Sequence, residues 1–332
     1  MVVCGHSGED WDTNAVRVEI RLAESARVSI RILMDNGGTK EIQASATVCD
    51  LSGVAGRGVS VNTFDLGPLA SCTDLRELRL HANRMKSIDL SPLESCTRLE
   101  RITLHSNRLT KVDLSPLASC TSLREITLGR NRLSSIDLRP LASCIGLERL
   151  HLNDNSFVDE YLATPPVLPH LRELSISGGE KSSLDLSPIE SGCSSLEWFS
   201  IDGRQLTSLD LTPLAACSSL RVIWLRNLQL RTIDLTPLAN CSRLEDFSVS
   251  DCEFEILDLT PLASCSRLRK VWIGNVPISR IDLGPLSKCE SLEELNLSEN
   301  TLQAVDLTPL LSCSRLVRIN LSNNELEAAV LG

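Results

Sequence analysis

Apolar and polar residues alternate in a short segment that recurs along most of the chain. In the copy that begins at Leu75, the apolar residues Leu78 and Leu80 alternate with the polar residues Arg79 and His81. A period of two is typical of a strand with one buried and one exposed face. The segment returns every 24 residues or so down to the C-terminus, so the pattern predicts one short strand in each repeat.

An Asp-Leu pair marks the same repeat and gives its length. The pairs are 24 residues apart, except for one step of 48 and one of 25, and begin at Asp65, Asp89, Asp113, Asp137, Asp185, Asp210, Asp234, Asp258, Asp282 and Asp306. The long step contains a degenerate unit with Tyr161-Leu162 in place of Asp-Leu, and the step of 25 contains one extra residue near Gly192. A fixed period of this size predicts a solenoid of stacked units.

The segment after each Asp-Leu pair predicts a short helical turn. In seven units a Ser or Thr precedes a proline, as at Ser91, which suits an N-cap followed by Pro at the first helical position. Leu93 and Cys96 are three residues apart and therefore share one face of this turn. We expect both side chains to point into the core.

Written from the strand, one unit is Leu75-x-x-Leu78-x-Leu80-x-x-Asn83-x-Met85, which resembles the leucine-rich repeat, L-x-x-L-x-L-x-x-N-x-L. The resemblance covers eleven units. It implies an α/β solenoid, an arc or horseshoe with a parallel β-sheet on its concave face and short helical turns on its convex face. It also implies that the asparagines bind the backbone of adjacent turns. The middle units depart from the pattern and carry other residues in this slot: Gly179, Arg204, Leu228, Cys252 and Val276. The curvature there stays open.

Two parts of the chain are expected: a β-rich N-terminal capping region at 1–60 and a leucine-rich-repeat solenoid of about eleven repeats at 61–332. Strand-like alternation at 16–22 and 28–33 supports the capping region. A turn signal, Asn36-Gly37-Gly38, then precedes Ile42.

A worn repeat, meaning a copy that has lost part of the pattern, is expected before the first clear unit. Four apolar residues fall 24 positions before apolar repeat positions of that unit: Leu51, Val54, Val61 and Phe64. At the C-terminal end, the sequence predicts no capping segment after the last unit. The C-terminal edge is therefore expected to be uncapped, which leaves open a homo-oligomer formed through that edge.

The net charge limits the classes of partner. Lys and Arg total 33 against 43 Asp and Glu, which gives a net charge of -10. No chain-wide basic field exists to hold nucleic acid or an anionic lipid surface. The chain also lacks an apolar run of about 18 residues, and its start lacks the build of a secretion signal. We therefore expect a cytoplasmic protein that binds neither nucleic acid nor membrane.

The cysteines are interpreted as packing residues. Ten of the 13 occupy one slot of the repeat, namely Cys72, Cys96, Cys120, Cys144, Cys193, Cys217, Cys241, Cys265, Cys289 and Cys313. Leu168 takes this slot in the degenerate unit, which indicates a small apolar filler and disfavours disulfide or metal chemistry. The recurring Asp is similarly interpreted as a turn cap, in preference to a calcium ligand. No metal or cofactor is expected.

Catalytic motifs are missing from the sequence. It contains no Gly-rich phosphate loop, nucleophile elbow or Glu-bearing zinc motif. His81 and His105 occupy one column of adjacent strands, about 4.8 Å apart, which is close enough to share a metal. No third ligand completes that site, and arginines lie nearby. We therefore expect a noncatalytic protein.

The exposed strand positions divide into three zones. The first four units carry a basic zone, whose candidate partner-binding residues are Arg79, His81, Arg101, His105, Arg130 and His151. Units six to nine carry an aromatic zone with Trp198, Val222, Trp224, Arg226 and Trp272. Units eight and ten are acidic. A ligand that matches all three zones would be extended, with an acidic end, an apolar middle and a basic end.

Exposed tryptophans on strands indicate an interface, because Trp and Arg dominate binding energetics. The alternative is that the rings only shield one another or cover the sheet. The sequence therefore predicts a noncatalytic interaction module that binds a protein or extended peptide on its concave face. A second hypothesis is a regulatory subunit or activator of an enzyme such as a phosphatase or GTPase.

Overall fold

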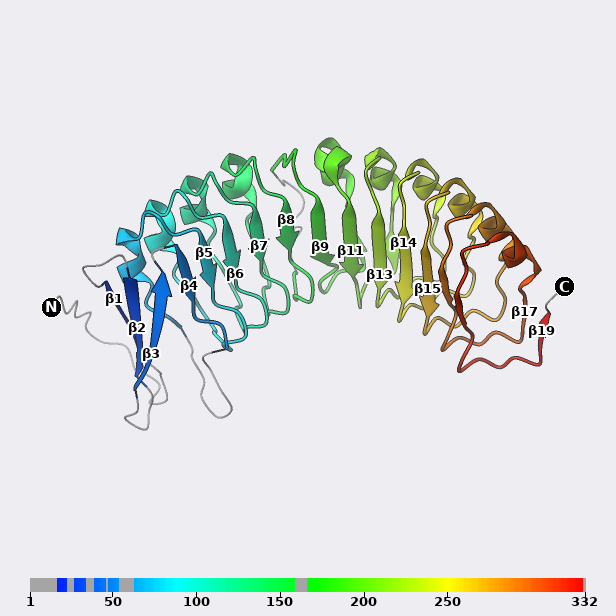
Figure 1. Cartoon of the computed structure of the whole chain (residues 1–332), viewed down its shortest axis with the longest axis horizontal. Coiled ribbons are helices and arrows are strands. Elements are labelled where there is room, and N and C mark those ends of the chain that lie inside the picture. The colour runs from blue at the N-terminus through cyan, green and yellow to red at the C-terminus, as the bar shows by residue number, and fades with distance from the viewer. Residues whose placement is uncertain are drawn as a thin grey trace.

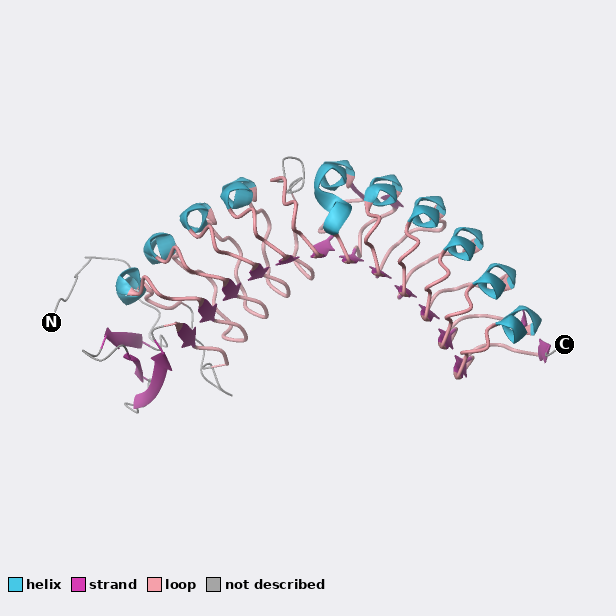
Figure 2. Cartoon of the chain, turned by 45° about the horizontal axis from the view of Figure 1, so that its top comes forward, coloured by secondary structure: helices cyan, strands magenta, loops and turns pink. Residues whose placement is uncertain are grey.

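The computed structural model describes residues 17–22, 27–33, 39–45, 47–53, 63–158 and 166–330. Within them the chain forms an arc of stacked units (Figure 1). The strands lie side by side along the inner, concave side, and short 3-10 turns lie along the outer, convex side (Figure 2). This is the predicted leucine-rich-repeat solenoid, and the arc continues without interruption through the middle units.

The first strands are antiparallel and precede the repeats. They are β1 (Arg17–Leu22), β2 (Arg27–Leu33) and β3 (Thr39–Ser45). The short strand β4 (Val48–Asp50) then pairs antiparallel with β3 at one position and parallel with β5. The predicted strands near 16–22 and 28–33 are thus confirmed. The predicted turn at 36–38 and the predicted domain boundary at 60/61 lie outside the described residues, and the boundary stays a prediction.

The worn repeat before the first unit exists, but its predicted register is wrong at the strand. Phe64 keeps the predicted spacing of 24 and is buried, and Val54 and Val61 lie outside the described residues. Cys49 pairs with Leu78, which is 29 residues later and not 24. Leu51 is fully buried and donates its N–H to the Arg79 carbonyl, so it takes the place of Leu80. The connection after this strand is five residues longer than in the other units, and a search at a constant period cannot find it.

The repeat strands have two lengths. The three-residue strands are β5 (Glu77–Arg79), β6 (Arg101–Thr103), β7 (Glu125–Thr127), β8 (Arg149–His151), β16 (Glu294–Asn296) and β18 (Arg318–Asn320). The five-residue strands are β9 (Glu173–Ser177), β11 (Trp198–Asp202), β13 (Val222–Arg226), β14 (Asp246–Ser250) and β15 (Lys270–Gly274). Two further pairs are parallel: β10 (Ser183–Leu184) with β12 (Ser208–Leu209), and β17 (Ala304–Asp306) with β19 (Ala328–Val330).

The long strands coincide with the units that lack the slot asparagine. Where it is present, as at Asn107, its side-chain NH2 donates to the Leu80 and Leu104 carbonyls, and its Oδ1 accepts the backbone N–H groups of Asn83 and Met85. The asparagine side chain therefore forms hydrogen bonds with backbone groups at the end of the strand, as the resemblance implied. Without it, two more residues per unit join the sheet.

Each described turn opposite the strands begins at the residue before a proline. The 3-10 turns are η1 (Gly67–Ser71), η2 (Ser91–Ser95), η3 (Ser115–Ser119), η4 (Arg139–Ser143), η5 (Ser187–Ser195), η6 (Thr212–Ala216), η7 (Thr236–Asn240), η8 (Thr260–Ser264), η9 (Gly284–Lys288) and η10 (Thr308–Ser312). The nine-residue η5 contains the extra residue predicted near Gly192, since the next strand pairing, Glu173 with Trp198, spans 25 positions.

The predicted N-caps are wrong. Ser91 and its equivalents make no side-chain capping bond and are the first residues of the turns. The cap is the Asp two positions earlier, because Asp89 Oδ1 accepts the Ser91 backbone N–H at 2.9 Å. The other nine repeated aspartates make the same bond, which confirms the turn-capping interpretation of the Asp column.

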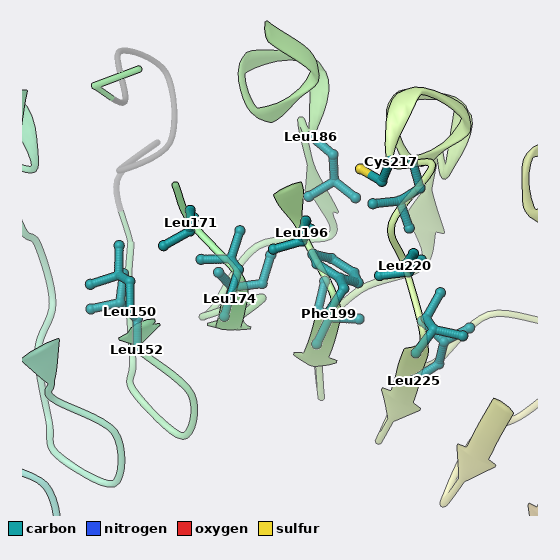
Figure 3. Close-up of a cluster of buried hydrophobic side chains, with 14 of the residues drawn as sticks. Leu150, Leu152, Leu171, Leu174, Leu186, Leu196, Phe199, Cys217, Leu220 and Leu225 are labelled. Atoms are coloured by element: carbon teal, nitrogen blue, oxygen red, sulfur yellow. The ribbon is translucent and has the colours of Figure 1, made fainter. Parts of the chain in front are cut away.

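The core is a continuous stack of leucines and other apolar side chains between the strands and the turns (Figure 3). Leu93 and Cys96 are both fully buried, as predicted. Leu168 is also buried, and Leu171 and Leu174 keep the repeat register in the degenerate unit. The replacement of its Asp-Leu pair by Tyr161-Leu162 lies outside the described residues.

The cysteines that share one slot of the repeat, which we call the cysteine column, form hydrogen bonds as well as filling the core. In seven units the thiol donates to the Leu carbonyl of the preceding turn, at Sγ···O distances of 3.4–3.6 Å. Each thiol therefore ties one unit to the one before it. The expectation of no disulfide is wrong at one step, because Cys193 and Cys217 are disulfide-bonded with their Cα atoms 5.1 Å apart. Both come from the column, and their Cα separation is within the range of a disulfide.

Candidate binding surface

The candidate tryptophans lie on the strand face opposite the core. Trp198 begins β11, and Trp224 is the middle residue of β13. The register pairs Trp198 with Val222 and Ser200 with Trp224, so the two rings are diagonal neighbours in adjacent strands, as predicted. Their centroids are 4.5 Å apart, and the rings meet at 61°. Both are half-buried, while the flanking core residues are fully buried. We call Trp198, Val222 and Trp224 the tryptophan patch.

Trp272 stands apart from this patch. It lies on β15, two strands from Trp224, and Ser248 of β14 separates them in the same column. Its side chain is 48% exposed, and its indole lies against the backbone of Gly274. Arg226 ends β13 and is exposed. Of the aromatic candidates, the structure therefore brings together Trp198 and Trp224 with Val222, and leaves Trp272 as a separate exposed ring.

The predicted basic zone is largely neutralised by its own sheet. Arg101 of β6 binds Glu77 on one side and Glu125 on the other, at 2.8 Å each. Arg79 similarly binds Asp50 and Glu77. Arg130 lies beyond its strand, 3.5 Å from Asp154, and is 72% exposed. The acidic end expected for a ligand therefore has little free positive charge to meet on these strands.

The histidines of this zone are packed against one another and against their neighbours. His81 and His105 stack with centroids 4.5 Å apart and planes 14° from parallel. Stacked imidazoles direct their lone pairs within parallel planes and not toward one ion. Burial, followed by His81 and Arg130, lowers the pKa of His105. His151 Nε2 lies 3.4 Å from Glu173. Among the residues that the structure describes, no three His, Cys, Asp or Glu side chains are grouped to hold a metal ion.

Two columns of alternating charge run across the concave sheet. The flank column stands just before the strands and alternates without a break through ten units: Arg76, Glu100, Arg124, Glu148, Arg172, Glu197, Arg221, Glu245, Arg269 and Glu293. Five Arg–Glu bridges join its members in pairs, and a sixth, between Arg221 and Glu197, links two of these pairs. The first-strand column is the next position in each unit: Glu77, Arg101, Glu125, Arg149, Glu173, Trp198, Val222, Asp246, Lys270, Glu294 and Arg318.

The first-strand column loses its charges only at Trp198 and Val222. On either side, Arg101 bridges Glu77 and Glu125, and Glu294 lies within salt-bridge distance of Lys270 and Arg318. The tryptophan patch therefore interrupts an otherwise continuous charge pattern. Sequence reasoning named Trp198 and Val222 but missed the pattern that they break. The signal was present in the sequence as a sign change every 24 residues.

The side chains next to the patch are poorly paired. Burial raises the pKa of Asp246, and the Trp224 indole N–H and the Lys270 ammonium lower it less strongly. The Trp224 Nε1 is nevertheless buried without a well-directed hydrogen bond. Burial also raises the pKa of Asp202, which accepts a hydrogen bond from Asn227. The patch thus combines apolar rings with carboxylates that have lost part of their hydration.

Repeats of this construction define the family. A family model described as leucine rich repeat matches residues 73–133, 97–157 and 266–326. Together with the stacked strands and turns, these matches show that the chain is a leucine-rich-repeat protein. A comparison with curated proteins finds no match.

Solved structures share the fold at low sequence identity. An internalin (inlF) from Listeria monocytogenes is 23% identical, with a TM-score of 0.63, over 86% of this chain and 85% of that one. A leucine-rich-repeat protein from Leptospira interrogans is 18% identical, with a TM-score of 0.62, over 84% and 79%. The functional domain of InlJ from L. monocytogenes, whose structure includes a cysteine ladder, is 19% identical, with a TM-score of 0.60, over 87% and 57%.

Along the described residues, no helix is long and apolar enough to cross a membrane. The cytoplasmic location expected from the sequence stays a prediction. The final described unit exposes Ile319, which follows the core register of the preceding units, and Val317, which takes the flank-column position after Glu293. Self-association through this edge also stays a prediction.

Proposed function

We propose that this chain is a noncatalytic interaction module that binds a protein or extended peptide on its concave sheet, centred on the tryptophan patch. The observation that supports this most strongly is the break in the first-strand column. Charged side chains at these positions are well solvated and form ion pairs with side chains of adjacent units. Two apolar residues there therefore have no evident role in folding. The diagonal Trp pair adds the residue type that carries the largest share of binding energy in interfaces.

The alternative that the rings only shield each other receives partial support from their edge-on contact. However, that contact leaves both rings half-exposed, and the Trp224 N–H has no well-directed acceptor. A pair that served only packing would give its polar atom a hydrogen-bond partner as well as cover its carbon surface. A solved structure of the Toll–Spätzle complex, from Drosophila, is also similar to this chain, at 17% identity and a TM-score of 0.61, over 83% of this chain and 43% of that one. That complex shows that a related fold can bind a protein, and the location proposed here depends on the patch alone.

The experiment uses the full chain as bait in a lysate of the cells that express it. The captured protein is then purified, and its affinity is measured by calorimetry for the wild type and for the Trp198→Ala/Trp224→Ala variant. We expect the variant to bind about 30-fold more weakly, which corresponds to about 2 kcal/mol for an interface hot spot. A single variant, Trp198→Arg, should have the same effect while restoring a cation beside Glu173.

The matched control is Ile145→Ala, which removes an exposed apolar side chain after turn η4 on the convex side. It should leave the affinity unchanged. Circular dichroism spectra of all variants should match the wild type. Undiminished capture by both tryptophan variants would exclude the patch as the binding site. Loss of the native spectrum in Trp198→Arg would instead show that the rings are structural.

A further inference from the structure

The carboxylates of the first-strand column differ in how they are paired. Glu77, Glu125 and Glu294 each have two cationic side chains within salt-bridge distance. Glu173 and Asp246, the two acids that border the tryptophan patch, have no Lys or Arg within this distance among the described residues. Glu173 instead approaches the imidazole of His151, and Asp246 is attracted by Lys270 from farther away. The break in the column therefore leaves two carboxylates short of a cation.

These two acids lie at opposite ends of the patch. Glu173 pairs in register with Trp198, then Val222, then Asp246, so three strand steps separate the acids. Adjacent strands are about 4.8 Å apart, which places the two acidic positions roughly 14 Å apart. An extended chain advances about 3.4 Å per residue, so four residues of a peptide crossing the strands span that distance. Side chains four residues apart on an extended chain also point to the same face.

Both carboxylates remain accessible enough to be contacted. The Glu173 side chain is 35% exposed, and Asp246 is half-buried. The aromatic rings between them favour the same kind of ligand, because Lys and Arg are attracted to the face of an indole. An acidic ligand would instead place a third negative charge beside two unpaired ones. The net charge of -10 acts in the same direction at longer range.

We propose that the tryptophan patch binds an extended segment of a partner protein in which an apolar residue stands midway between two Lys or Arg residues four positions apart. The apolar side chain packs on Trp198 and Trp224, and the two cations pair with Glu173 and Asp246. This inference rests on the proposed function and specifies the chemistry of its partner. The bound segment is therefore basic at both ends of the patch. The three zones of the sequence had instead predicted a ligand with an acidic end, an apolar middle and a basic end.

Synthetic ten-residue peptides with a Ser/Thr background test this directly. The main probe carries Lys at positions 3 and 7 and Leu at position 5. One comparison peptide has Gln and another has Glu at positions 3 and 7, and a third has Lys at positions 4 and 6. Binding to the full chain is followed by quenching of tryptophan fluorescence at low ionic strength. We expect the main probe to bind at least tenfold more tightly than each of the other three.

The carboxylates are then neutralised in the Glu173→Gln/Asp246→Asn variant, which keeps side-chain shape. We expect the main probe to lose its advantage over the Gln peptide. The matched control, Glu94→Gln, removes a carboxylate from the convex turn η2 and should preserve the full advantage. Equal binding of the Lys and Glu peptides, an advantage that survives neutralisation, or no binding of any peptide at millimolar concentration would overturn the inference.

The partner captured with the full chain separates the two proposals. If the Trp198→Ala/Trp224→Ala variant loses that partner and the Glu173→Gln/Asp246→Asn variant does not, the patch is the site but its ligand is not basic. If neither variant loses the partner, the proposed function itself fails.

Discussion

The buried thiols of the cysteine column make the stability of this protein sensitive to alkaline pH. Cys265 is fully buried, and its Sγ lies 3.6 Å from the Leu238 carbonyl oxygen of the preceding turn. Burial, followed by the neighbouring Cys241 and Cys289, raises the pKa of Cys265 from 9.0 to about 12. In the unfolded chain the same thiol regains its ordinary pKa. Its contribution to stability is therefore fully present below pH 9 and is lost as the pH rises toward 12.

The size of this loss follows from the two pKa values. At pH 10 an unfolded thiol is mostly ionised and the folded one is not, which favours unfolding by roughly 1–2 kcal/mol per thiol. Seven buried thiols have pKa values raised to about 11 or 12: Cys49, Cys96, Cys120, Cys241, Cys252, Cys265 and Cys289. Their sum is roughly 10 kcal/mol, which is comparable to the whole stability of a typical domain.

Urea unfolding of the wild type and of Cys265→Ala at pH 7 and pH 10, under reducing conditions, isolates one thiol. The substitution should cost about 1–2 kcal/mol at pH 7, because it leaves a small cavity and removes the S–H donor. At pH 10 this cost should shrink by roughly 1–2 kcal/mol, since the variant has one fewer thiol to ionise on unfolding. The control Leu262→Ala should cost about 2–5 kcal/mol equally at both pH values. An equal cost of Cys265→Ala at both pH values would refute the reasoning.

Two further predictions concern the contacts between units. Asn107→Ala leaves the backbone N–H groups of Asn83 and Met85 without their side-chain acceptor and removes one of two side-chain donors from each of the Leu80 and Leu104 carbonyls. It should therefore lower the free energy of unfolding by roughly 2–4 kcal/mol in urea titrations. A cost below about 1 kcal/mol would mean that water replaces these bonds. Arg101→Ala breaks two bridges on a partly exposed surface and should cost only about 0–1 kcal/mol, falling further at 1 M salt. A larger, salt-independent cost would show that the charge columns hold the sheet together.

Much of the fold could be predicted from the sequence, because each structural role recurs at one spacing. The leucines, the capping aspartates and the buried cysteines occupy equivalent positions in successive units, so a residue in one unit predicts its counterpart in the next. The register even survived the degenerate unit, where Leu171 and Leu174 kept their spacing. The predictions that were wrong concern features that the spacing does not decide. The first unit has a longer connection after Cys49, and the Cys193–Cys217 disulfide involves one pair from a column of similar residues.

The candidate site was harder to predict, because its properties depend on pairs of side chains in adjacent strands. Arg101 was interpreted as free positive charge, although its partners Glu77 and Glu125 lie in the two neighbouring strands of the same column. Arg79 was interpreted in the same way, although it pairs with Glu77 of its own strand and with Asp50 of β4. A residue-by-residue list of exposed positions does not show such pairing. Comparing the residues of one column from unit to unit shows the alternation of charge that produces these pairs. The same comparison identifies Trp198 and Val222 as the positions where the alternation stops.

The way a solenoid distributes its stability explains why a binding site can occupy this position. Each unit contacts only its neighbours, and stability comes mainly from the buried stack of leucines and phenylalanines. Exposed ion pairs add little to that stack, about 0–1 kcal/mol each. Replacing the charges at Trp198 and Val222 with apolar residues therefore gives up little folding energy, while it creates the apolar surface and the two unpaired carboxylates that a basic, apolar segment can bind. The same replacement in the core column, for instance at the fully buried Phe199 between them in sequence, would have no such freedom.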